Sequence, residues 1–66
     1  MTKQIVEKIE RLGFIVKLVH VNGTVEIHAM SIEHDALQIA RCYDGDGPDE
    51  ERRAAFVLAE ALGIKF

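Results

Sequence analysis

The dipeptide Asn22-Gly23 constrains the fold of this chain more than any other feature, because it lies between two runs of β-forming residues. Residues 14–21 are mostly apolar and β-branched, and residues 24–30 alternate between apolar and polar or small side chains. Asn-Gly favours the two-residue turn of a β-hairpin, in which both turn residues take a positive φ. We therefore predict a hairpin with its turn at this dipeptide.

A two-residue turn also sets the register of the two strands. It pairs Val21 with Thr24 and, further along, Val19 with Glu26. Since side chains alternate between the two sides of a strand, one face carries the predicted core residues Phe14, Val16, Leu18, Val25, Ile27 and Ala29. The other face carries a mixture of apolar and charged side chains, which is more apolar than a solvated face requires: Ile15, Lys17, Val19, Val21, Glu26, His28 and Met30.

Two helices are expected to flank this hairpin. Near the start of the chain, Thr2 is a candidate cap, Ile5, Val6, Ile9 and Leu12 have helical spacing, and Gly13 ends the pattern. The second helix is predicted from Gly47 as its cap and Pro48 at its first position, with Gly63 at its end. Its predicted buried stripe consists of Ala54, Val57, Leu58, Ala61 and Leu62.

Residues 31–43 fit two interpretations. The apolar residues have helical spacing after Ser31, but the segment is short and "LQIARCY" fits a strand returning from a turn at residues 33–35. We favour the strand. The predicted fold is therefore a single α+β domain over residues 1–66, in the order α-β-β-β-α, with a three-stranded antiparallel sheet and both helices packed on one face.

This order resembles the double-stranded-RNA-binding domain family. That family begins its last helix with Gly-x-Gly-x-Ser-Lys-Lys-x-Ala-Lys, and its lysines bind phosphates. Gly45 and Gly47 match the glycines, and "AL" at residues 61–62 matches the closing pair of the family. The cations are absent, since Asp49, Glu50, Glu51 and Ala54 stand where the family has serine and lysines. The resemblance implies the fold and argues against the RNA-binding activity.

A second resemblance is to small bacterial and phage proteins of unassigned function. The segments "QIARCYDGDGPDE" and "LAEALGI" carry it. This likeness implies no activity.

The charge balance opposes binding to polyanions. The chain has 8 Lys and Arg against 11 Asp and Glu, so its formal net charge is −3. Generic nucleic-acid binding depends on cations that neutralise phosphates, so nucleic acid is not an expected partner. A degenerate nucleic-acid-binding domain is the alternative hypothesis, and it would use Lys17, Arg41, Arg52 and Arg53.

The segment 44–51 holds five acids and two glycines, which raises the question of a bound ion. A phosphate cradle needs neutral or positive surroundings. Oxygen donors suit calcium or magnesium, and the candidate ligands are Asp44, Asp46 and Asp49. Acids also favour a helix start without any ion, and we prefer that explanation, so no metal and no cofactor are expected.

Nothing in the sequence predicts an enzyme. The three histidines and Cys42 match no common zinc spacing, and there is no nucleotide fingerprint or nucleophile motif. A single unpaired cysteine suits a reducing compartment, and no segment resembles a signal peptide or a membrane span. We expect a non-catalytic protein of the cytoplasm.

The mixed sheet face is the strongest functional candidate. A contiguous apolar patch on a small domain usually marks an interface. We predict an interaction module that binds itself or another protein, with a homodimer favoured. Its predicted interface residues are Ile15, Val19, Val21, Met30, Ile39 and Tyr43.

Overall fold

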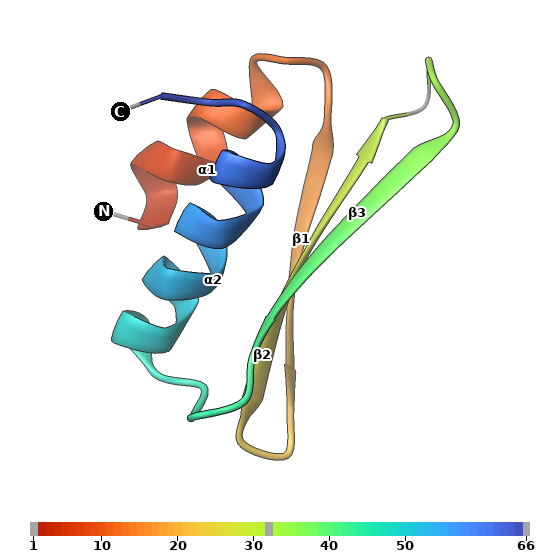
Figure 1. The fold of residues 1–66 in the computed structure, drawn as a ribbon. Coiled ribbons are helices and arrows are strands. Elements are labelled where there is room, and N and C mark those ends of the chain that lie inside the picture. Colours follow the sequence, from red (N-terminus) through yellow and green to blue (C-terminus); the bar gives the residue numbers. More distant parts are fainter. Residues whose placement is uncertain (1, 32, 66) are drawn as a thin grey trace.

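A computed structural model describes residues 2–31 and 33–65, and it has the predicted α+β fold. The sheet is three-stranded, with β2 in the middle and β1 and β3 at its edges. Figure 1 shows both helices on the same side of the sheet. The elements in chain order are α1 (Thr2–Glu10), β1 (Ile15–Val21), β2 (Thr24–Ser31), β3 (Ala36–Cys42) and α2 (Pro48–Ala61).

The hairpin forms at the predicted turn and in the predicted register. Asn22 and Gly23 have φ values of 48° and 77°, as the turn requires. Val21 pairs with Thr24, and Val19 pairs with Glu26. The turn chemistry therefore aligns the whole ladder, because a strand pair has a single register once its turn is set.

The ambiguous segment is a strand, as we favoured. Residues 33–35 form the turn, and β3 then pairs antiparallel with β2, so that Val25 lies opposite Cys42. Asp35 closes this turn at φ 49°, a left-handed conformation that aspartate tolerates better than most residues. The central strand β2 thus has both of its edges paired.

The core lies between the sheet and the helices. α2 packs mainly on β3 and β2, while α1 packs on α2 and contacts β1. Alternation along β2 buries every second side chain from Val25 to Ser31. The buried hydrophobic residues are Ile5, Ile9, Val25, Ile27, Ala29, Ala40, Cys42, Ala54, Ala55, Leu58 and Ala59.

Both ends of α2 match their prediction. Gly47 is the N-cap and Pro48 the first helical residue, and the carboxylate of Glu50 accepts a hydrogen bond from the Gly47 N–H at 3.1 Å. Gly63 has φ 78°. That conformation turns the chain back, so that the Ile64 N–H donates to the carbonyl of Ala59 at 2.9 Å.

Several predicted core positions are wrong, each for a reason of packing. Leu12 is exposed because α1 ends at Glu10. Val57 and Ala61 are exposed because the buried side of α2 carries Ala55 and Ala59 in their place. Leu18 is 39% exposed because the helices lie mainly over β2 and β3. Thr2, the candidate cap of α1, is its first helical residue.

Among the described residues, no helix has the length and apolar content needed to cross a membrane.

Candidate interaction surface

The face of the sheet opposite the helices is called the open face below. β2 contributes Glu26, His28 and Met30 to it, since these alternate with the buried residues of that strand. The two pairings align side chains from all three strands into rows across the sheet. The rows are Ile15–Met30–Leu37, Lys17–His28–Ile39 and Val19–Glu26–Arg41.

The first of these rows is apolar in all three strands. Ile15, Met30 and Leu37 are 52%, 47% and 56% exposed, and we call them the apolar row. Ile39, in the next row, is also exposed. The apolar row lies at the end of the sheet away from the Asn22-Gly23 turn. It leaves three large apolar side chains side by side in water, whereas scattered single ones need no explanation.

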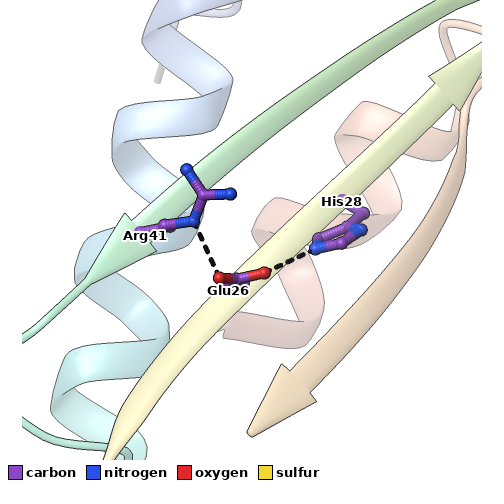
Figure 2. Close-up of polar contacts among 3 residues, drawn as sticks. All are labelled: Glu26, His28 and Arg41. Carbon is purple, nitrogen blue, oxygen red and sulfur yellow. Dashed lines mark hydrogen bonds and ion pairs between the residues drawn. The ribbon is translucent and has the colours of Figure 1, made fainter. Parts of the chain in front are cut away.

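A polar cluster occupies the middle of the open face, as Figure 2 shows. The Arg41 Nε donates to Glu26 Oε2 at 2.7 Å, and the His28 ring nitrogen Nε2 lies 2.9 Å from Glu26 Oε1. These hydrogen bonds, first from His28 and then from Arg41, hold the pKa of Glu26 below its ordinary value. Glu26 in turn raises the pKa of Arg41. The cluster ties β2 to β3 across the open face.

The predicted interface residues are distributed along the open face. Ile15, Met30 and Ile39 lie at its apolar end, and Val19 is half-buried opposite Glu26. Val21 is exposed beside the hairpin turn. Tyr43 follows the end of β3, is largely exposed, and lies close enough to Arg41 to raise the pKa of that guanidinium.

Leu37 belongs to the apolar row, and the sequence prediction missed it. The signal was present, because the period of two that placed Ile39 and Tyr43 on this face also places Leu37 there.

Two candidate metal ligands, Asp44 in the acidic loop before α2 and Asp49 in the first turn of α2, pair with arginines of that helix. Asp44 lies 2.8 Å from Arg53, and Asp49 lies 3.5 Å from Arg52. No three histidine, cysteine, aspartate or glutamate side chains in the described parts of the chain are placed to hold a metal ion together. The candidate ligands Asp44, Asp46 and Asp49 therefore do not converge.

Arg53 also reaches the thiol of the preceding strand. Its Nη1 lies 3.9 Å from the Sγ of Cys42, which is buried in the core. The side chain thus joins the end of β3, the acidic loop and the first turns of α2. These contacts link the loop to α2.

The four cations of the nucleic-acid alternative are not brought together. Lys17 and Arg41 belong to the open face, while Arg52 and Arg53 lie on α2, which packs on the other side of the sheet. Arg41, Arg52 and Arg53 each pair with a carboxylate. This arrangement does not form a continuous basic surface for a phosphate backbone.

The histidines are also separated. His20 lies on the helix side of β1, where its Nε2 is 3.4 Å from Glu51 of α2. His28 lies on the open face with Glu26. The two rings project to opposite sides of the sheet.

Comparison with models of protein families, with characterised proteins and with solved structures finds no match for this chain. Its class is therefore defined by its topology. It is a small α+β domain in which an antiparallel three-stranded sheet is flanked by one helix at each end of the chain. That topology is consistent with the fold of double-stranded-RNA-binding domains.

Proposed function

We propose that this protein is a non-catalytic interaction module that self-associates through its open face. The observation that carries the proposal is the apolar row, where Ile15, Met30 and Leu37 are each about half exposed and adjacent. Because about half of each side chain is already covered, its further burial against another protein contributes roughly 1 kcal/mol. A second copy offers the same apolar row, so an isologous contact is complementary by symmetry.

The polar cluster is expected to contribute to the specificity of the association more than to its affinity. Glu26 is already hydrogen-bonded to His28 and Arg41 within one chain, so a partner need not supply a counter-ion for it. Such pre-formed clusters at an interface fix orientation and disfavour partners of the wrong charge. Lys17, in the neighbouring row, adds a positive charge on the same face.

The size of the face indicates a weak association. Two strands of seven residues and one of eight cover about 14 by 25 Å in plan, whereas stable interfaces bury about 800 Å² on each partner. Contact through one open face alone is therefore expected at micromolar concentrations. The unpaired Cys42 fits the reducing environment of the cytoplasm, and we propose that compartment.

Leu37→Asp tests the proposal. A carboxylate in the apolar row would be desolvated in the assembly but hydrated in the monomer, so the association should weaken by about tenfold or more. The stability of the monomer should change by less than about 0.5 kcal/mol, because Leu37 is exposed. Sedimentation velocity over a range of concentrations measures the association, and thermal unfolding measures the stability.

Val57→Asp is the matched control. Val57 is as exposed as Leu37 but lies on α2, away from the open face. It should leave the association unchanged. If both variants weaken the association equally, or if the wild type remains a monomer at high concentration, the open face is not the interface.

Nucleic-acid binding remains the rival hypothesis, with Lys17, Arg41, Arg52 and Arg53 as its residues. The separation of these cations on two sides of the sheet, and the carboxylate partners of the three arginines, argue against it. We therefore do not adopt it.

A further inference from the structure

The free edge of β1 has a composition that is unusual for an exposed edge strand. Proteins usually protect such edges with charges, prolines or bulges. β1 has the sequence IVKLVHV, with Lys17 as its one lysine or arginine and no proline. It pairs only with β2, so its outer edge is not hydrogen-bonded to another strand in the described parts of the chain.

β1 also exposes apolar surface on both of its faces. Ile15 and Val21 are exposed on the open face, and Leu18 is 39% exposed on the helix side. Leu18 is exposed because the helices pack mainly over β2 and β3 and leave the outer part of β1 uncovered. A strand added beside β1 would cover these side chains.

The hairpin determines which peptide groups lie along this edge. A two-residue turn is closed by a hydrogen-bonded pair, here Val21 and Thr24, and hydrogen-bonded pairs then alternate along the ladder. The peptide groups of the intervening residues point away from β2. These residues are Val16, Leu18 and His20.

We propose that β1 pairs with β1 of a second copy, antiparallel, about a two-fold axis at Leu18. Leu18 is the central residue of the seven in β1, so this register uses the whole strand. It also aligns the outward peptide groups of both chains, because Val16 lies opposite the partner's His20 and Leu18 opposite the partner's Leu18. The product is a continuous six-stranded sheet with the helices of both copies on one side.

The side chains are self-complementary in this register. Lys17 lies opposite the partner's Val19 rather than the partner's Lys17, so the strand's lysine does not face its symmetry mate. A register shifted to centre on Lys17 would place the two ammonium groups opposite each other, which is destabilising. On the open face, Ile15 lies opposite the partner's Val21.

The other edge, β3, is less suited to this pairing. Its helix-side residues Ala40 and Cys42 are already buried, because α2 packs directly on β3. A copy of β3 at that edge would bring its own α2 against this one. β3 also has a single β-branched residue, Ile39, whereas β1 has Ile15, Val16, Val19 and Val21.

Edge pairing goes beyond the proposed function and does not depend on it. The edge contact uses peptide groups and Leu18, whereas the proposed self-association uses the apolar row on the open face. Pairing at the edge joins two open faces into one surface of about twice the area. That larger surface, about 700 Å² in plan, approaches the 800 Å² or so that each partner buries in a stable interface.

Leu18→Cys tests the pairing directly. Cα atoms of a hydrogen-bonded antiparallel pair lie about 5.5 Å apart, within the range that a disulfide spans. With oxidised glutathione under native conditions, we expect this variant to form a covalent dimer, seen on a non-reducing gel and removed by reductant. The control variant is Val57→Cys. Val57 is more exposed than Leu18, and both variants retain the native Cys42, so we expect this control to remain a monomer on the same gel.

A second variant measures the association without cross-linking. Leu18→Lys places two ammonium groups together at the two-fold axis, so it should weaken the association by about tenfold or more. The monomer should remain folded by circular dichroism, since Leu18 is partly exposed. A folded Leu18→Lys variant that associates like the wild type overturns the edge pairing.

Edge pairing at β1 and self-association through the open face can be tested independently. The double variant Leu18→Cys, Leu37→Asp should still cross-link, because Leu37 lies on the open face and not at the β1 edge. If Leu18→Cys cross-links no faster than Val57→Cys, the edge pairing is overturned. This conclusion does not depend on the effect of Leu37→Asp on the association.

Discussion

At the scale of single residues, Glu26 is the most constrained side chain of the open face. It accepts hydrogen bonds from both His28 and Arg41, so its ionised form has two partners in the folded chain. These partners lower its pKa from the ordinary value of 4.5. The stabilisation is therefore fully present above pH 4.5 and is lost as the pH falls through the lower pKa of the folded state.

Glu26→Gln should reveal this dependence. At neutral pH, we expect the variant to melt at a lower temperature than the wild type, because glutamine cannot accept two charge-assisted hydrogen bonds. The difference should shrink as the pH falls below 4.5 and Glu26 becomes protonated in the wild type. Melting curves from pH 7 to acid measure it, with Glu33→Gln in the exposed β2–β3 turn as the control. A difference that does not change with pH would contradict the ionic origin.

At the scale of elements, the β1–β2 hairpin depends on its turn. Gly23 has φ 77°, and a Cβ built there meets no atom within 4 Å. A side chain is therefore disfavoured by backbone conformation alone and not by a clash. Substitutions of Gly23 therefore measure the effect of side-chain chirality on stability separately from the effect of side-chain volume.

Gly23→Ala should destabilise the fold by about 1 kcal/mol, because an L-residue is strained in this left-handed conformation. Replacement of Gly23 by D-alanine, which chemical synthesis of a 66-residue chain permits, should instead stabilise it by about 0.5 kcal/mol. The D-residue prefers positive φ and reduces the freedom of the unfolded chain. Urea unfolding measures both. Equal destabilisation by the two enantiomers would show that volume, not chirality, determines the turn.

At the scale of the whole molecule, the core is small. Five of the eleven buried hydrophobic residues in the described chain are alanines. A domain of about 60 residues buries only about 60% of its unfolded surface and is only marginally stable by itself. The proposed association would add to this stability, because a partner that binds only the folded chain favours the folded state.

We therefore expect the melting temperature to rise with protein concentration. For a dimer that unfolds to two chains, a tenfold increase in concentration should raise it by about 3–5 °C. Scanning calorimetry over about two orders of magnitude in concentration measures the effect, and it should be smaller in both Leu37→Asp and Leu18→Lys. A melting temperature that is independent of protein concentration would indicate that the monomer is stably folded without association.

Local chemistry made much of the fold predictable. The pairing of Val19 with Glu26 follows from Asn22-Gly23, and the ends of α2 follow from Gly47, Pro48 and Gly63. These features depend on φ preferences and hydrogen bonds within a few residues, which the sequence specifies directly. The open face was predictable for the same reason, since the period of two along each strand sorts its side chains.

Other features were decided only by tertiary packing. Leu18 belongs to the predicted core face, but whether it is covered depends on where the helices lie across the sheet, and they lie mainly over β2 and β3. Val57 is apolar and helical, yet the rotation of α2 about its axis directs it into solvent and buries Ala55 instead. Local sequence specified the two helices, the β1–β2 hairpin and the register of that hairpin, because those depend on near neighbours in the chain. Tertiary structure decided which apolar side chains remain exposed, because that depends on contacts between elements distant in sequence.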